Sequence, residues 1–274
     1  MSNETQIEFW NGPAGDVWVE AQELMDQMLA PLSDAALGAA APLSGEKVID
    51  IGCGCGATTL AISQSGASVQ GVDISVPMVA RARDRTVDQE NVTFSVADAS
   101  VAEFGAEHDL LFSRFGVMFF DDPRAAFSNL RSALVEGGRL VFVCWQSPKK
   151  NPFMSVAGRA AQPYMPEPDP QDPRAPGPFA FSDSNWVTEI LDGSGFSGIT
   201  VSSLTPNLTV GKNIDEAMYF QSRVGPLARV LAELDEATQV KAKQAVREAL
   251  SEYETKDGVI LPAAAWLVQA KSSG

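Results

Sequence analysis

The chain has 274 residues, of which 45% are hydrophobic, and its 20 basic and 35 acidic residues give a formal charge of −15. That hydrophobic share supports a packed core and excludes wholesale disorder, while the negative charge would repel DNA or RNA from most of the surface. We therefore expect a single domain over 1–274 and no nucleic-acid partner; the oligomeric state stays open.

The first residues and the cysteines indicate where in the cell the protein is expected and whether it binds a metal ion. The first residues, MSNETQIEFWNGP, show no basic region followed by an apolar run, and no window approaches the roughly 18 apolar residues of a membrane span. We expect neither a signal peptide nor a membrane span. Cys53, Cys55 and Cys144 are odd in number, which favours reduced thiols in a cytoplasmic protein. With His108 as the single histidine, we expect no metal site.

The first half of the chain alternates helical and strand patterns. Apolar spacing predicts a helix over 16–31, closed by Pro31. Short apolar runs and helical segments then alternate. The predicted strands are 47–52, 68–75, 92–100, 109–115 and 139–145, and the predicted helices are 57–66, 76–89 and 123–138. The last of these helices is expected to stop at two glycines. Such alternation predicts an α/β fold with a parallel, doubly wound sheet.

The character changes after Trp145. Residues 146–181 contain nine prolines and are expected to form a long loop without regular structure. A helix (183–195), a strand (198–204), a mostly helical stretch (213–254) and a last strand (259–271) follow. The sheet needs only a helix and a strand hairpin after Trp145, so we expect 146–181 and 213–254, with 1–30, to act as lid or cap segments.

A glycine-rich turn follows the first predicted strand, in VIDIGCGCGATTL (48–60). Glycine lets the backbone approach a ligand closely, although a tight turn alone would also use it. Turns that bind a pyrophosphate favour a third glycine one position later, so this spacing indicates a different ligand.

Acidic residues stand at the ends of three successive predicted strands: Asp50, Asp73 and Asp98. A strand-end acid alone is often a cap or turn former. Three of them around the glycine turn indicate a ligand site, in which Asp73 could accept hydrogen bonds from ribose hydroxyls and Asp98 from an adenine amino group.

The segments VIDIGCGCGATTL, GVDIS, VADAS and LRSALVEGGRLVFVCW resemble, in order and spacing, the signature segments of the class I S-adenosylmethionine-dependent methyltransferases, over about residues 45–145. The resemblance implies a Rossmann-like seven-stranded sheet with an antiparallel last strand, and S-adenosyl-L-methionine as cofactor. It places Asp50 and the glycine turn near the methionine part, Asp73 on the ribose and Asp98 at the adenine. The cofactor-binding residues it implies are Asp50, Gly52, Cys53, Gly54, Gly56, Asp73, Ile74, Met78, Asp98, Ala99 and Ser113.

NVTFSVADAS and SRFGVMFFDDP resemble the small-molecule branch of that superfamily, which includes quinone methylases. SRFG stands where base-amine methylases carry an Asn-Pro-Pro-Tyr type motif, in agreement with the charge. Methyl transfer by in-line displacement needs alignment and exclusion of water, so no catalytic residue is assigned.

Candidate acceptor-binding residues come from outside the signature segments. Trp10 and Trp18 flank a flexible turn and would suit either a closing lid or the core. Arg114, after the fourth strand, could hold an anionic group on the acceptor, and Tyr219 could line an apolar cavity or simply pack in the core. The acceptor, and whether its O, N, S or C atom is methylated, stays open.

Two other functions are compatible with these residues. One is a non-catalytic S-adenosylmethionine-binding sensor or scaffold. The other is a nicotinamide-dependent oxidoreductase using Asp73 on the ribose, against which the turn spacing and Asp98 argue. For any of these, we expect the strand before 213–254 to run parallel to the first five, so that this block leaves the sheet above the ligand.

Overall fold

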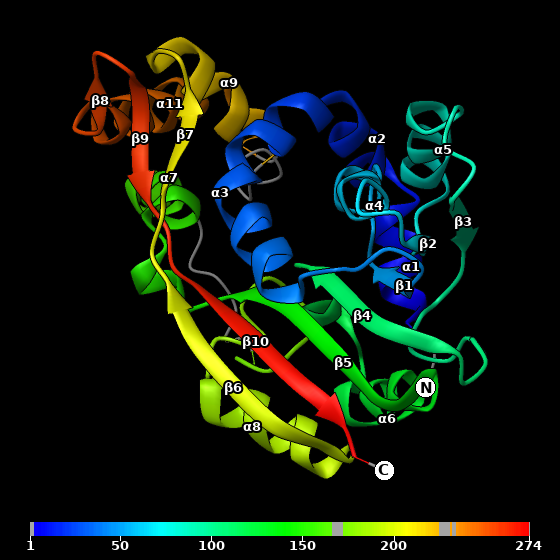
Figure 1. Cartoon of the computed structure of the whole chain (residues 1–274). Helices are drawn as coiled ribbons and strands as arrows, with labels where there is room; N and C mark the ends of the chain where they lie inside the picture. Colours follow the sequence, from blue (N-terminus) through cyan, green and yellow to red (C-terminus); the bar gives the residue numbers. More distant parts are fainter. Residues whose placement is uncertain (1–2, 166–171, 225–230, 232–233, 274) are drawn as a thin grey trace.

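The computed structural model describes residues 3–165, 172–224, 231 and 234–273 (Figure 1). Its α-helices are α1 (Glu4–Trp10), α2 (Pro13–Glu20), α3 (Gln22–Ala40), α4 (Ala57–Ser63), α5 (Val76–Arg85), α6 (Pro123–Ser132), α7 (Pro152–Ala161), α8 (Ser184–Gly193), α9 (Ile214–Arg223) and α11 (Glu236–Ser251). Its strands are β1 (Lys47–Ile51), β2 (Ser68–Asp73), β3 (Val92–Val96), β4 (His108–Arg114), β5 (Leu134–Trp145), β6 (Phe196–Leu204), β7 (Asn207–Gly211), β8 (Glu254–Thr255), β9 (Gly258–Pro262) and β10 (Ala265–Ser272).

A seven-stranded sheet in the order β3-β2-β1-β4-β5-β10-β6 forms the body of the molecule. Strands β1 to β5 pair in parallel, whereas β10 runs antiparallel to both β5 and β6. The predicted fold class is therefore confirmed, including the antiparallel last strand. Because β5 and β6 both oppose β10, β6 ends at the same edge of the sheet as β1 to β5.

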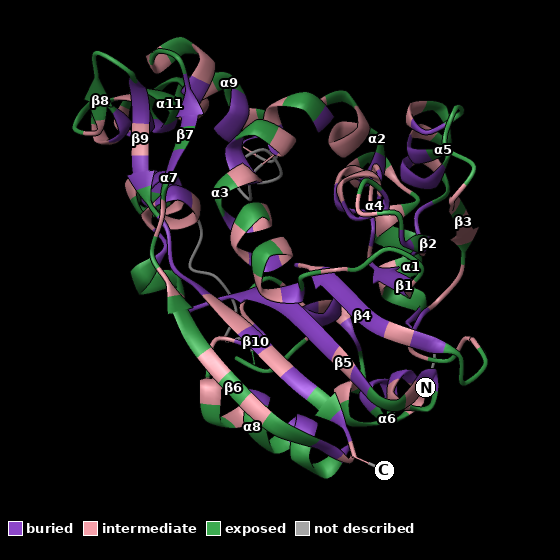
Figure 2. Cartoon of the chain, viewed as in Figure 1, coloured by how far each residue is buried: buried purple, intermediate pink, exposed green. Residues whose placement is uncertain are grey.

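Helices cover both faces of the sheet (Figure 1). Helix α3 lies in front of β4 and β5, and α6 and α8 lie behind. Residues 140–145 of β5 are all buried, as expected for a strand covered on both faces (Figure 2). Phe142 packs on Phe127 of α6, with ring centroids 5.7 Å apart.

A second lobe follows the carboxyl end of β6. A three-stranded antiparallel sheet, β7-β9-β8, packs there with α7, α9 and α11. The predicted last strand over 259–271 is in fact two strands in different sheets. Ala263 and Ala264 connect β9 in the second lobe to β10 in the main sheet. The short strand β7 was not predicted.

The predicted helix over 16–31 is wrong at both ends. The structure has two helices, α2 and α3, and Pro31 lies inside α3. Proline removes one helical hydrogen bond, but the buried face continues past it through Leu32, Ala36 and Ala40. Packing of that face on the sheet outweighs the lost bond.

Two other expectations need correction. The helix over 123–138 ends at Ser132, and β5 already begins at Leu134, whose pairing with His108 precedes a register shift around the two glycines. The proline-rich stretch 146–181 contains helix α7, with Pro152 at its first turn, where a proline costs no hydrogen bond. Residues 166–171 of that stretch lie outside the described residues.

His108, the single histidine, is buried at the start of β4, where it is 6% exposed. Its Nδ1 lies 3.2 Å from the carbonyl oxygen of Ala133. The contact joins the start of β4 to the chain leading into β5, far along the strand from the glycine turn. His108 therefore has a structural role rather than a role at the glycine turn.

Candidate cofactor and acceptor site

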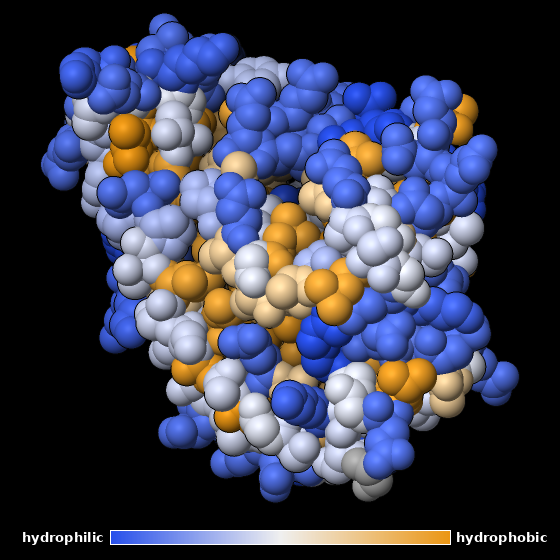
Figure 3. Space-filling model, viewed as in Figure 1, coloured by the Kyte–Doolittle hydropathy of each residue, from blue (hydrophilic) through white to orange (hydrophobic). Residues whose placement is uncertain are grey.

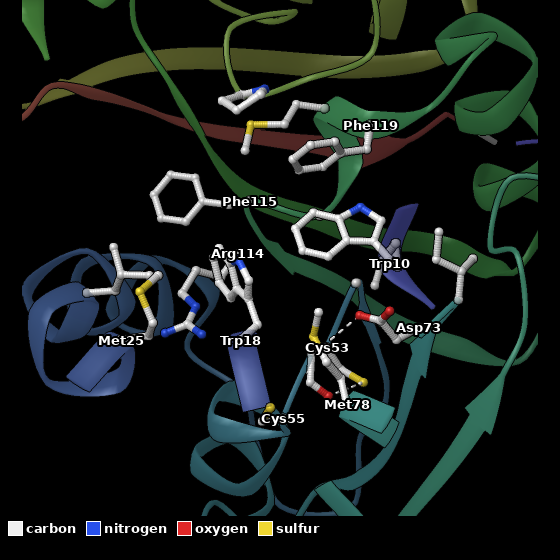
Figure 4. A pocket seen from close by; sticks show the side chains of 18 of the residues that line it. Trp10, Trp18, Met25, Cys53, Cys55, Asp73, Met78, Arg114, Phe115 and Phe119 are labelled. Carbon is white, nitrogen blue, oxygen red and sulfur yellow. Dashed lines mark hydrogen bonds between the residues drawn. The ribbon is translucent and has the colours of Figure 1, made fainter. Parts of the chain in front are cut away.

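A cavity of about 300 Å³ opens at the carboxyl ends of β1, β2, β4 and β5 (Figure 4). The strand order reverses between β1 and β4, and the crevice at such a switch point is where open α/β sheets bind ligands. Its volume is that of a small-molecule site. Of the predicted residues it is lined by Gly52, Cys53, Gly54, Asp73, Ile74, Met78, Asp98, Ala99, Trp10, Trp18 and Arg114.

The three glycines of the turn after β1 all have positive φ but meet different neighbours. A Cβ on Gly52 would lie 2.6 Å from Cα of Gly116, and one on Gly56 would lie 3.0 Å from Cβ of Ala82. Around Gly54 only the sulfur of Met78 is near, at 3.6 Å. Packing of the backbone therefore requires Gly52 and Gly56, whereas Gly54 faces the cavity.

Asp50, Gly56 and Ser113 do not line the cavity. Asp50 is fully buried behind the turn, where its Oδ2 accepts hydrogen bonds from the hydroxyls of Thr58 (2.7 Å) and Thr59 (2.6 Å). Burial raises the pKa of the Asp50 carboxyl to about 6, against the lowering effect of both threonines and of Arg114.

Ser113 Oγ donates to the Ile51 carbonyl (2.8 Å) and accepts from the Gly116 backbone (3.2 Å), so it ties the end of β4 to β1. Asp50, Gly56 and Ser113 therefore shape the turn from behind.

Asp73 joins the turn to the end of β2. Its Oδ2 accepts from the backbone N–H of Gly54 at 2.8 Å and its Oδ1 from that of Ser75 at 2.9 Å. Burial raises the pKa of Asp73, and these two N–H groups oppose the shift. The carboxylate is thereby oriented toward the cavity, with lone pairs left for a ligand hydroxyl.

The cysteine thiols stay protonated near neutral pH. Burial raises the pKa of Cys53 and raises that of Cys55 to about 11. Both side chains line the cavity as small apolar groups.

Asp98, two residues after β3, has one carboxylate oxygen in use and one free. Its Oδ1 accepts from Asn3 Nδ2 (3.1 Å) and from the Ser100 backbone (2.9 Å). Its Oδ2 is buried and has no partner among the described residues. A buried acceptor without a donor in the protein suits a ligand N–H, as an adenine amino group would provide.

Asn3, which was not predicted as a site residue, also accepts a hydrogen bond from the Asp121 backbone N–H at 2.9 Å and lines the cavity. It bridges the chain after β3 to the chain after β4. No pattern marks a lone Asn at a chain start as a binding residue.

The N-terminal helices close over the β2 end of the cavity. Trp10 makes edge contacts with Trp18 (5.6 Å between centroids) and Phe119 (5.5 Å). Its carbonyl accepts from the Ser75 hydroxyl at 2.8 Å. Asn11 donates to the Ile74 carbonyl and accepts from the Val76 backbone, both at 2.9 Å.

The opposite wall of the cavity is aromatic and rich in methionine. Phe115 stacks on Trp145 with ring centroids 3.9 Å apart and planes 8° apart, and Trp145 contacts Phe153. The surrounding apolar residues are Met25, Met28, Leu29, Met118, Met154, Phe179, Phe220 and Val224. They come from α3, from the chain just after β4, from the proline-rich stretch and from the 213–254 block.

Tyr219 is not one of the residues lining the cavity. It is 59% exposed, and its ring faces the Arg223 guanidinium on the outside of α9. The next two residues, Phe220 and Gln221, are the ones that line the cavity. The helical pattern of this segment does not show which side of the helix faces the cavity, so it could not distinguish Tyr219 from Phe220.

The described residues hold no group of three or more His, Cys, Asp or Glu side chains placed to bind a metal ion. Within the same residues, no helix is long and apolar enough to cross a membrane.

Comparison with known proteins gives a match to a methyltransferase domain over residues 48–138. The chain is 30% identical over 122 residues to aklanonic acid methyltransferase DauC of Streptomyces sp. (strain C5), a match spanning 42% of this chain and 56% of that protein. It is 32% identical over 115 residues to demethylmenaquinone methyltransferase of Clavibacter sepedonicus, spanning 42% and 47%. The chain thus spans about half the length of these two relatives.

An uncharacterized protein of Mycobacterium tuberculosis is 27% identical over 256 residues, 88% of each chain. Among solved structures, the YcgJ protein from Bacillus subtilis superposes with a TM-score of 0.59 at 19% identity, covering 88% of this chain and 98% of that one. Phosphoethanolamine N-methyltransferase 2 of Haemonchus contortus, solved with S-adenosylhomocysteine, gives 0.55 at 22%, covering 89% and 53%. These two similarities concern the fold.

The sheet order and the match over residues 48–138 identify a Rossmann-like fold that contains a methyltransferase domain. The similarity to S-adenosylmethionine-dependent methyltransferases rests on this part of the chain.

Proposed function

We propose that the protein transfers the methyl group of S-adenosyl-L-methionine to a small, largely apolar acceptor. The observation that carries the proposal is that one cavity joins the strand-end acids and the glycine turn to a wall of aromatic and methionine side chains. Two relatives are named for small-molecule acceptors, aklanonic acid and demethylmenaquinone, which supports this acceptor class. We propose no nucleic-acid acceptor, because the net charge is −15.

The cofactor would lie along the strand ends. Gly54 leaves room for its methionine part, Asp73 would accept hydrogen bonds from ribose hydroxyls, and the free Oδ2 of Asp98 would accept one from the adenine amino group. Trp10 and Asn3 would cover the nucleoside. When bound, S-adenosylmethionine supplies an activated methyl group on a sulfonium whose departure leaves a neutral thioether.

The protein's own contribution would be alignment and exclusion of water. The cap segments 1–30, 146–181 and 213–254 would enclose the acceptor between Trp18, Phe115 and Phe220, whose apolar surfaces favour a flat, weakly polar molecule. We assign no residue as a general base. The three free cysteines are compatible with a cytoplasmic location, which we also propose.

The test is transfer of a labelled methyl group from S-adenosylmethionine into an extract of small metabolites. We expect label in a low-molecular-weight product with the wild type and none with Gly54→Val, which fills the cavity beside Met78. Gly105→Val, a change at an open surface glycine with similar φ, is the matched control for backbone strain.

Thermal shift and calorimetry separate the alternatives. Stabilisation by NADH instead of S-adenosylhomocysteine would refute the proposal in favour of an oxidoreductase. Binding of S-adenosylhomocysteine without label in any fraction would favour a sensor.

A further inference from the structure

Arg114 is a cation inside the cavity, and most N–H donors of its guanidinium make no hydrogen bond among the described residues. Its side chain is 13% exposed and lines both the main cavity and a smaller one of about 130 Å³ behind it. Among the described residues its one hydrogen bond runs from Nη1 to the Ser33 hydroxyl, at 3.1 Å. A guanidinium has five N–H donors in a planar fork, so most of the fork faces the cavities.

A purely structural role for Arg114 would be to neutralise Asp26, but the geometry is poor for that. The Arg114 Nη2 atom lies 3.9 Å from Asp26 Oδ1, beyond hydrogen-bonding distance. The other oxygen of Asp26 is already held by Arg85 at 2.9 Å and by Gln22. Asp26 therefore has its own close counter-ion, and Arg114 is left with Asp26 at 3.9 Å and with the Asp50 carboxylate, to which it makes no hydrogen bond among the described residues.

The backbone next to Arg114 sends two successive side chains toward the cavity. In a regular strand neighbouring side chains point to opposite faces. Phe115 has φ +63°, a left-handed conformation that is strained for an aromatic residue, and both Arg114 and Phe115 line the cavity (Figure 4). Strain of this kind persists where the surroundings hold it and is concentrated at functional sites.

We infer that Arg114 forms a carboxylate-binding position in the cavity, between Trp18 and Phe115. The inference rests on the proposed function and deepens it. A carboxylate matches the planar fork, and burial makes each charge-assisted bond stronger than it would be in water. Burial lowers the pKa of the Arg114 guanidinium, and the carboxylates of Asp26 and Asp50 oppose the shift.

Two ligands could supply that carboxylate: the methionine end of the cofactor or the acceptor. Calorimetry on the full-length protein separates them. The first arm compares S-adenosylhomocysteine with its carboxamide, and with 5′-deoxy-5′-methylthioadenosine, which lacks the amino-acid part. The second arm titrates protein saturated with S-adenosylhomocysteine with 2-naphthoate and with the neutral 2-naphthamide. Each arm is run on wild type, Arg114→Gln and Arg114→Lys.

The matched control is Arg159→Gln, which removes an exposed cation of α7 whose side chain is not among those lining the main cavity. If the cofactor supplies the carboxylate, Arg114→Gln lowers affinity for S-adenosylhomocysteine roughly tenfold or more and leaves 5′-deoxy-5′-methylthioadenosine unchanged. If the acceptor supplies it, the same loss is seen for 2-naphthoate but not for 2-naphthamide. Arg114→Lys should lose less affinity in either case, and Arg159→Gln should match the wild type.

Equal affinity for acid and amide in both arms of the wild type would overturn the inference, even if the Arg114 variants fail to fold. Failure of the proposed function looks different, because then neither S-adenosylhomocysteine nor 5′-deoxy-5′-methylthioadenosine binds at all.

Discussion

Asp50, Asp73 and Asp98 occupy equivalent places at three strand ends, yet their surroundings differ. Asp50 is sealed behind the glycine turn by two threonine hydroxyls. Asp73 holds the turn itself through Gly54. Asp98 has one carboxylate oxygen that is buried without a hydrogen-bond partner among the described residues. Replacing each of them should therefore change a different property of the protein.

Asp73→Ala should weaken binding of S-adenosylhomocysteine by about 1.5–3 kcal/mol, roughly 10- to 150-fold, because a charge-assisted acceptor for the ribose is lost. Isothermal calorimetry on folded protein measures this. Asp192→Ala, at an exposed position of α8, is the control and should bind as the wild type does. Unchanged affinity in Asp73→Ala would refute the ribose assignment.

Asp50 should make stability fall as pH rises. Its pKa is about 6 in the folded state and near 3.8 when unfolded, so between these values the folded state binds more protons. The destabilising effect of ionisation thus develops between about pH 4 and pH 6 and is constant above, on the order of 3 kcal/mol.

Asp50→Asn cannot titrate at this position, and the difference in unfolding free energy between wild type and Asp50→Asn isolates the effect from other carboxylates. We expect the wild type to lose stability relative to Asp50→Asn from pH 4 to pH 6.5, as measured by urea unfolding without cofactor. A difference that does not vary with pH would contradict the burial of an ionisable carboxyl here.

Helices α1 and α2 are attached to the sheet by polar contacts as well as by their tryptophans. Asn11 holds both the Ile74 carbonyl and the Val76 backbone N–H, directly beside Asp73. Helix α3, by contrast, is fixed by a long apolar face. The first two helices are thus the elements best suited to open for cofactor exchange.

Asn11→Ala should speed dissociation of S-adenosylhomocysteine several-fold and increase hydrogen exchange in residues 3–20, with little change in thermal stability. Asn185→Ala, an exposed asparagine at the start of α8, is the matched control. Stopped-flow competition gives the dissociation rate. An unchanged rate together with unchanged exchange would show that these helices do not gate the site.

The molecule as a whole is a sheet with a second lobe set over its carboxyl-end edge. The surface around it is mostly hydrophilic, and hydrophobic atoms gather in the middle of one face, in the region of α3 and β10 (Figure 3). The second lobe contributes Phe153, Phe220 and Gln221 to the cavity, and Gln221 donates to the Phe153 carbonyl at 2.9 Å. Under the proposed function, we therefore expect acceptor choice to depend on how the two lobes meet.

Replacing residues 212–258 with an Asn-Gly turn should keep cofactor binding and abolish methyl transfer. Gly211 and Val259 already pair across β7 and β9, so a two-residue hairpin turn can join these strands. We expect affinity for S-adenosylhomocysteine within a few-fold of wild type by calorimetry, with no labelled product. Phe220→Ala tests the same wall without a deletion and should reduce transfer more than cofactor binding.

Circular dichroism and thermal unfolding must first show that the hairpin variant is folded. Retained methyl transfer in a folded hairpin variant would refute the proposed cap role of the block.

Local pattern was sufficient for β1 to β5 and for the residues at their carboxyl ends. Buried parallel strands are short apolar runs, and glycines with strand-end acids have few alternative explanations. The same reasoning failed at Pro31, at Gly137 and Gly138, and at β9 and β10, where tertiary pairing or packing overrides local preference. It also placed Tyr219 rather than Phe220 in the cavity, because helical periodicity does not reveal which neighbour a helix faces.

The sequence alone predicted an α/β fold with a glycine turn over 52–56 and acids at Asp73 and Asp98, because those features depend on contacts within a few residues of each strand end. Only the tertiary structure showed the unpartnered oxygen of Asp98, the bridging Asn3, the distance of Arg114 from Asp26, and the apolar wall of the cavity. These depend on residues far apart in the chain, and their distances are set by packing that no local pattern records.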